Sequence, residues 1–376
     1  MQFRDIIGQE SVKQTIRLSV QQGRIPHARL LTGIEGVGKL PLALAYAQYL
    51  ACQNRSDTDS CGKCPACLQY AKLQHPDLHF AFPIVKSDRG DTCDDFVEQF
   101  RDLILKQPYF GLEEWYTQLG NETKQGMIYE KESQEILRKL SLKSFGNGYK
   151  VMIIWQPEKM NIACANKLLK LLEEPPAETL FILVSEHPEQ LLPTILSRVQ
   201  QTPVPRLEES ELAQLFTNDI AHIANGSYLA AKRIQEDSGQ KAKFLDDFIA
   251  MMRSAYTIGK INDPKKKYDA LCYLKDWCAN MADSKKSGRE YQKAFLQYAQ
   301  QQVRENFIFN LQCPEMNYQT ADEKQFSTRF APFINTGNVE KIMNELDRAE
   351  QQISQNGNAK IIFFDLCIQM IVLIKR

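Results

Sequence analysis

Apolar and polar residues form blocks along the first two hundred positions that predict strands and helices in turn. Short apolar runs bounded by turn residues predict buried strands, and these are Ala28–Thr32, Lys150–Trp155 and Thr179–Val184. Helical spacing of apolar side chains predicts helices over Ser11–Gln22, Pro41–Cys52, Ser133–Leu142, Ala163–Glu174 and Pro188–Arg198. Because strands alternate with helices, we expect a parallel, three-layer α/β domain.

The strand pattern stops after Pro203-Val204-Pro205. The remaining chain predicts helices nearly throughout: Glu208–Phe216, Ser227–Gln235, Lys243–Ser254, Lys267–Ala282, Arg289–Phe309, Val339–Gln355 and Ala359–Ile374. A domain boundary near residue 205 follows from this change. The apolar stretch Ile361–Ile374 is shorter than the about 20 residues that span a bilayer, so we expect a helix that lies in the core or in an interface.

The composition is that of an ordinary soluble protein. The chain has 376 residues, of which 43% are hydrophobic and 24% charged, as in ordinary soluble domains. Lys+Arg and Asp+Glu both total 46, so tight nucleic-acid binding through bulk charge is not expected. Met1–Asp5 is not followed by the apolar core of a signal peptide. We therefore expect a cytoplasmic protein without a membrane partner.

A phosphate-binding loop with one defect follows the first predicted strand. Residues 33–40 read Gly-Ile-Glu-Gly-Val-Gly-Lys-Leu, which matches the P-loop pattern except at its last position. Glycines let backbone N–H groups surround phosphate oxygens, the lysine reaches the terminal phosphates, and a Ser or Thr hydroxyl binds Mg²⁺. The candidate nucleotide-binding residues are Gly33, Gly36, Gly38 and Lys39. Leu40 has no hydroxyl for a metal ion.

Four cysteines follow the next predicted helix. Cys52, Cys61, Cys64 and Cys67 have the spacing C-x8-C-x2-C-x2-C. Two-residue gaps let neighbouring thiolates bind one ion, and four sulfurs complete the tetrahedral shell of Zn²⁺. Because such a shell has no position for water, we expect a structural zinc site. The alternative is four free thiols, with Cys52 in a helix core.

Several of these segments together resemble a known family. They are Ile7-Gly8-Gln9, Ala28–Gly33, the four cysteines, His75-Pro76-Asp77, Leu168–Pro176 (LLKLLEEPP) and Ser197-Arg198. The set is similar to subunits of the bacterial DNA polymerase III clamp loader, members of the AAA+ superfamily, and most of all to its δ′-type subunits. The resemblance covers most of residues 1–200.

The resemblance implies three domains. An AAA+ P-loop domain would occupy residues 1–205, with the Cys₄ zinc module at 52–67 and an insertion at about 86–127 that the family pattern does not explain. A small helical lid would cover 206–242. An all-α collar domain for oligomerisation would cover 243–376. The implied partners are the γ/τ and δ subunits, with the sliding clamp contacted indirectly and primer–template DNA contacted within the assembly.

Three parts of an ATPase differ from the active members of this family. Leu40 replaces the Mg²⁺-binding hydroxyl, Trp155-Gln156 stands where active members carry Asp-Glu, and Leu229 stands where the lid supplies an arginine. Phosphoryl transfer depends on positioning and charge stabilisation, so we expect no intrinsic ATPase activity and no bound Mg²⁺. Passive binding of ATP or ADP stays open, and the resemblance favours an empty or occluded site.

Arg198 is the residue to which the resemblance assigns a catalytic role. It stands where clamp-loader subunits present an arginine to a neighbouring subunit's ATP, although Val199 replaces the usual cysteine. From the residues alone, the favoured role of Arg198 is to complement the negative end of its own predicted helix. Two further hypotheses concern the whole chain: an active AAA+ motor subunit of the γ/τ type, and a free-standing zinc-dependent nucleic-acid binder. The zero net charge argues against the latter.

Overall fold

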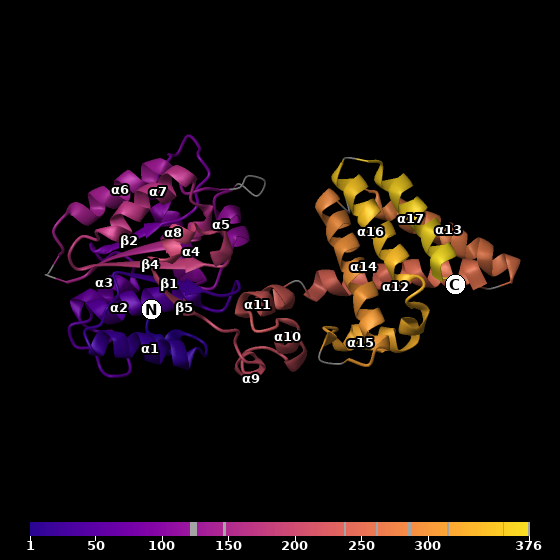
Figure 1. The fold of residues 1–376 in the computed structure, drawn as a ribbon. Coiled ribbons are helices and arrows are strands. Elements are labelled where there is room, and N and C mark those ends of the chain that lie inside the picture. The colour runs from indigo at the N-terminus through magenta and orange to yellow at the C-terminus, as the bar shows by residue number, and fades with distance from the viewer. Residues whose placement is uncertain are drawn as a thin grey trace. The chain divides into compact units, whose positions relative to one another are not determined.

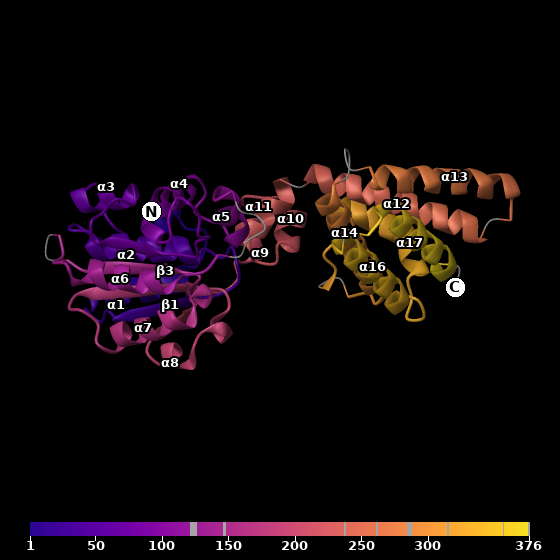
Figure 2. The same cartoon turned by 90° about the horizontal axis from the view of Figure 1, so that it is seen from above.

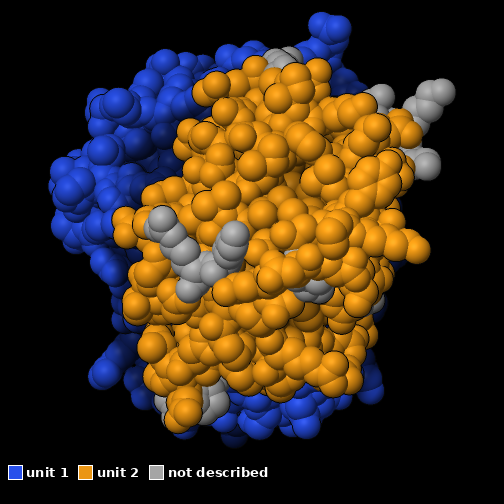
Figure 3. Space-filling model, turned by 90° about the vertical axis from the view of Figure 1, so that its right-hand side faces the viewer, with its two compact units in different colours: residues 1–232 blue, residues 233–376 orange. Residues whose placement is uncertain are grey.

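The computed structural model describes residues 1–120, 126–145, 148–236, 238–260, 262–283, 288–313, 316–355 and 357–374. The chain divides into two units, Met1–Lys232 and Arg233–Arg376, which Figure 3 colours blue and orange. The first unit contains the sheet and the second is helical (Figure 1). Within the described ranges, no helix is long and apolar enough to cross a membrane.

The first unit is built on a parallel five-stranded sheet with the order β2-β3-β4-β1-β5. The strands are β1 (Ala28–Thr32), β2 (Leu78–Ala81), β3 (Lys150–Trp155), β4 (Thr179–Ser185) and β5 (Gln200–Pro203). The side chains of β3 and β4 are buried along their whole length. Such continuous apolar strands are typical of a sheet covered on both faces, and the predicted α/β fold with a parallel sheet is confirmed.

Helices cover both faces of this sheet, with α1 and α2 on one side and α6 and α7 on the other (Figure 1). The helices of the unit are α1 (Glu10–Gln21), α2 (Lys39–Ala51), α3 (Pro65–Ala71), α4 (Val97–Lys106), α5 (Leu112–Gln118), α6 (Glu130–Ser141), α7 (Ile162–Glu173), α8 (Pro193–Leu196), α9 (Glu209–Leu212), α10 (Asn218–Ile223) and α11 (Tyr228–Glu236), the last of which crosses into the second unit. Helix α2 begins directly after the glycine loop and is buried over nearly all its length.

The insertion at about 86–127 carries helices α4 and α5, and residues 121–125 lie outside the described ranges. Its aromatic side chains enter the core of the first unit. Phe100 and Trp115 are fully buried, and the Phe100 ring stacks on Phe82 with 4.0 Å between centroids. Trp155, at the end of β3, lies 5.6 Å from Phe100 by the same measure. The insertion is therefore part of the core of the first unit.

The second unit consists of helices α12 (Ser238–Lys260), α13 (Pro264–Met281), α14 (Arg289–Asn310), α15 (Ala321–Phe330), α16 (Val339–Ser354) and α17 (Ala359–Ile374), which Figure 2 shows from a second direction. Helix α17 buries Phe363, Cys367 and Met370. A second stripe of the same helix is exposed: Ile361, Phe364, Ile368 and Val372. The apolar C-terminal helix thus contributes to the core and also presents an apolar face.

Two predicted helices differ from the structure. The predicted helix Pro188–Arg198 is a 3₁₀ turn at Pro188–Gln190 followed by α8 at Pro193–Leu196. Pro193 begins the new helix, and the residue before a proline avoids helical backbone angles. The predicted helix Glu208–Phe216 is reduced to α9. The division into compact units falls after Lys232, while the three-domain division at 205 and 242 stays a prediction.

Candidate functional site

The candidate nucleotide site lies where β1 ends and α2 begins. The loop between them spans residues 33–38, and Lys39 is the first residue of α2. Gly36 and Gly38 have φ angles of 80° and 95°, which L side chains rarely adopt. A Cβ atom at Gly38 would meet the ring of Tyr109 at 3.1 Å. The loop has the backbone of a phosphate-binding loop, and another part of the chain packs directly against it.

Aromatic side chains fill the space above this loop. Tyr109 and Phe110 come from the insertion, and Trp155 comes from the end of β3. The Phe110 and Trp155 rings lie 5.0 Å apart, and the backbone N–H of Ile7 donates to the Tyr109 hydroxyl at 3.1 Å. The remaining space is about 20 Å³. That volume holds about one water molecule, whereas ligand pockets measure roughly 300–1,000 Å³.

Lys39 is held inside the protein. Its ammonium group donates to the carbonyl oxygen of Ile34 at 2.5 Å and lies 3.7 Å from the Glu186 carboxylate. Burial lowers the pKa of Lys39, and the Glu186 carboxylate opposes this shift. A phosphate would have to replace both of these protein partners. Lys39 is therefore bound to groups of its own chain, whereas the lysine of an active P-loop binds the nucleotide.

The segment that begins α11 closes the loop from another side. The Ser227 hydroxyl donates to the Glu35 carbonyl at 2.8 Å, and the Tyr228 N–H donates to the Gly36 carbonyl at 3.1 Å. A Cβ atom at Gly36 would lie 2.7 Å from the Cβ of Leu229. Leu229 is fully buried. The position of the expected lid arginine therefore holds an apolar side chain packed on the glycine loop.

Arg198 lies two residues after α8 and outside this filled pocket. Its side chain is 34% exposed, and its guanidinium lies 2.6 Å from the Glu173 carboxylate. The same group donates to the carbonyl oxygen of Thr194 at 2.8 Å and to the Ser197 hydroxyl at 3.2 Å. The His27 ring lies 3.0 Å from the Arg198 carbonyl oxygen. The guanidinium is thus oriented by α7 and α8 while part of it stays accessible.

The four predicted cysteine ligands come together. The Sγ atoms of Cys52, Cys61, Cys64 and Cys67 all lie within 4.8 Å of one another. Those of Cys61 and Cys67 are 3.9 Å apart, close to the about 3.8 Å between sulfurs that tetrahedral Zn–S bonds of about 2.3 Å require. Backbone N–H groups of Lys63 and Cys64 lower the pKa of Cys61 to about 6. The donor set and its geometry fit Zn²⁺.

The predicted residues thus lie at three separate sites: the glycine loop with Lys39, Arg198, and the cysteine cluster. Tyr109, which covers the glycine loop, was not among the predicted site residues. Its segment has no strand or helix periodicity, so the only signal was the number of aromatic residues in the insertion.

Comparisons with known proteins show similarity to subunits of DNA polymerase III. The family described as DNA polymerase III, delta subunit, matches residues 8–208, which is 201 of the 376 residues. A subunit delta' of DNA polymerase III from Pseudomonas aeruginosa is 33% identical over 219 residues, covering 55% of each chain. The gamma/tau subunit from Mycobacterium tuberculosis is 27% identical over 218 residues, covering 57% of this chain and 31% of that one.

Similar solved structures include a gamma-subunit-related protein of DNA polymerase III from Thermotoga maritima. It is 13% identical with a TM-score of 0.40, covering 97% of this chain and 99% of that one. The match to the delta' relative spans about half the length of that protein.

Proposed function

The chain belongs to the family described as DNA polymerase III, delta subunit, and from this premise we propose that it is a δ′-type subunit of a bacterial clamp loader. In this proposal the subunit does not hydrolyse ATP. It supports assembly with γ/τ and δ subunits and supplies Arg198 to the ATP site of a neighbouring subunit. The assembly then loads the sliding clamp on primer–template DNA during replication.

The filled glycine loop is the observation that carries this proposal. About 20 Å³ remains beside Gly36, Gly38 and Lys39. The two positions that would hold metal are Leu40 and Trp155, and the position that would activate water is Gln156. A subunit whose own site admits no nucleotide can still contribute to hydrolysis elsewhere. Half-exposed Arg198 has the charge for that role, because a guanidinium supplied in trans stabilises phosphoryl transfer by about 10³–10⁵-fold in rate in GTPase systems.

In this proposal the cysteine cluster and the second unit support assembly of the clamp loader. The Cys52–Cys67 cluster would hold a structural Zn²⁺ ion that fixes the segment between α2 and α3. The second unit would serve as the collar, and the exposed stripe of α17 gives it an apolar face for a neighbouring subunit.

The test is a reconstituted clamp loader that contains Arg198→Ala in this subunit. We expect the complex to assemble as with the natural chain and its DNA-stimulated ATPase activity and clamp loading to fall. Arg138→Ala is the matched control, since Arg138 is an exposed arginine that also has a carboxylate partner. Unchanged ATPase activity in a fully assembled Arg198→Ala complex would overturn the trans role.

The alternative is an active motor subunit, which the similarity to gamma/tau subunits favours. It predicts ATP hydrolysis by the isolated chain that disappears on Lys39→Ala. Background activity that is equal in both preparations would exclude the motor.

A further inference from the structure

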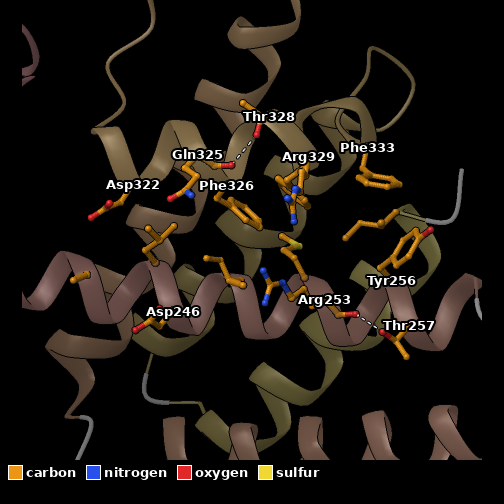
Figure 4. A pocket seen from close by; sticks show the side chains of 16 residues that line it. Asp246, Arg253, Tyr256, Thr257, Asp322, Gln325, Phe326, Thr328, Arg329 and Phe333 are labelled. Atoms are coloured by element: carbon orange, nitrogen blue, oxygen red, sulfur yellow. Dashed lines mark hydrogen bonds between the residues drawn. The ribbon is translucent and has the colours of Figure 1, made fainter.

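A groove runs between α12 and α15 in the second unit, and Figure 4 shows it from close by. Its volume is about 890 Å³, within the range of pockets that bind ligands. Its apolar surface comes from Leu245, Ile249, Met252, Phe326, Phe330 and Phe333. The Phe326 and Phe330 rings stack with 4.9 Å between centroids. The lining of the groove is more apolar than polar, so a partner with an apolar face would remove part of this surface from water.

The charged side chains around this groove are arranged in the same order along both helices. Asp246 and Arg253 lie on α12, and Asp322 and Arg329 lie on α15. In each helix the aspartate precedes the arginine by seven residues, about 10.5 Å along the axis at 1.5 Å per residue. Figure 4 shows the two aspartates toward one end, with the two arginines farther along. The groove therefore has an acidic end and a basic region.

These four side chains are exposed. Among the residues that the structure describes, none of the four has an ion-pair or hydrogen-bond partner within the chain. Two guanidinium groups above one apolar floor repel each other, and a carboxylate between them would be attracted to both. The four charged side chains are therefore placed to bind a ligand that carries both positive and negative groups. The ligand must also have an apolar face.

We propose that this groove binds an amphipathic helix of a protein partner. Its apolar side chains, spaced at i, i+3, i+4 and i+7, would cover the groove floor. Its basic residues would face Asp246 and Asp322, and its acidic residues, two turns away, would face Arg253 and Arg329. A helix is the occupant that matches, because its own seven-residue repeat equals the spacing of charge on both walls.

Charge also argues against a nucleic-acid strand as the occupant. Phosphates repeat one sign along the whole strand, so those beside Asp246 and Asp322 would be repelled. The inference concerns the second unit alone and does not depend on the proposed clamp-loader function.

The test uses the full chain and three synthetic peptides of one length with the same apolar face and blocked ends. The first carries two lysines and, seven residues later, two glutamates. The second has glutamine at all four positions, and the third has lysine at all four. Fluorescence anisotropy gives the dissociation constants. We expect the Lys/Glu peptide to bind about tenfold more tightly than either control, since several exposed ion pairs add small contributions. Equal affinity of the three peptides would overturn the proposal.

A double variant, Arg253→Ala with Arg329→Ala, locates the interaction. We expect it to weaken binding of the Lys/Glu peptide about tenfold while leaving the glutamine peptide unchanged. Lys341→Ala, an exposed change on α16, is the matched control and should bind as the natural chain does. Circular dichroism and thermal melting check that both variants are folded. Unaltered peptide affinity in a folded double variant, or displacement of the peptide by an equal concentration of a 20-nucleotide single strand, would refute the helix-binding groove.

Discussion

The carboxylate of Glu173 lies 2.6 Å from the guanidinium of Arg198. Glu173 is the last residue of α7 and Arg198 follows α8, so the contact joins two short motifs that are far apart in sequence. Both side chains are partly exposed, at 48% and 34%. In the proposed assembly, a phosphate group of a neighbouring subunit would therefore compete with Glu173 for this arginine.

We expect Glu173→Gln to keep the ATPase activity of a reconstituted loader at least at its natural level. The variant removes the competing negative charge, and the guanidinium keeps its bonds to Thr194 and Ser197. The free energy of unfolding should change by less than about 1 kcal/mol, as for exposed ion pairs. Steady-state ATPase assays and denaturant melts measure the two effects. Glu174→Gln, on the adjacent exposed residue, is the control. A loss as large as that of Arg198→Ala would instead make Glu173 a required positioning residue.

Nucleotide binding by this chain can be tested directly at the glycine loop. Because Tyr109, Phe110 and Trp155 fill the space beside Lys39, a fluorescent ADP analogue should show no saturable binding up to about 1 mM, a concentration that corresponds to a binding free energy of about −4 kcal/mol. Lys39→Ala should leave the ATPase activity of the assembled loader unchanged. The same substitution in the P-loop of an active subunit is the positive control. Saturable binding that disappears with Lys39→Ala would contradict the occluded site.

The packing of the insertion predicts a large stability effect at Phe100. Its ring lies 4.0 Å from that of Phe82 and 5.2 Å from that of Trp115, and its side chain is fully buried. Phe100→Ala should lower the free energy of unfolding by about 3–5 kcal/mol. Phe145→Ala makes the same chemical change at a side chain that is 65% exposed, and should cost less than about 0.5 kcal/mol. Urea melts of both variants decide whether the insertion is part of the core.

The sheet was predictable where strands are buried on both faces. Strands β1, β3 and β4 occupy the centre of the sheet and read as continuous apolar runs. Strands β2 and β5 are its edges and were missed. The β5 sequence Gln-Gln-Thr-Pro has no apolar pattern, and it is held by backbone pairing with β1. Local sequence does not indicate such a strand, because its pairing partner decides its structure.

The site likewise has a part that local sequence predicts and a part that depends on tertiary contacts. Gly36, Gly38 and Lys39 form a local motif, and their loop lies where the motif predicts. The cover over that loop is a tertiary contact by Tyr109, seventy residues farther along the chain. No periodicity signals such a contact, so the sequence predicted an altered site without indicating what fills it.

The cysteine cluster predicts one zinc ion per chain. Cys67→Ser should reduce the bound zinc to well below one per chain, because it removes one of four ligands from a closed shell. It should also lower the melting temperature, since metal-binding free energy contributes to folding. Elemental analysis and thermal melts provide the measurements. Cys272→Ser, at an exposed free thiol of α13, should change neither value. Full zinc occupancy in Cys67→Ser would exclude this residue as a required ligand.

The lowered pKa of His79, on strand β2, predicts that the protein loses stability in acid. Burial and the nearby positive charge of Lys139 lower the pKa of His79 from 6.5 to about 4. The unfolded chain therefore binds a proton more readily than the folded chain between these values, so stability falls as the pH decreases from about 6.5 through 4. A shift of this size corresponds to about 3 kcal/mol at 1.36 kcal/mol per pKa unit.

The comparison of His79→Gln with the natural chain isolates this group from the carboxylates that titrate in the same range. The difference in unfolding free energy between the two proteins should change by about 3 kcal/mol between pH 7 and pH 4, with the variant less sensitive to acid. His187→Gln removes an exposed histidine and should follow the natural curve. If the natural chain and His79→Gln lose stability in parallel, then His79 is protonated as readily in the folded state as in the unfolded state.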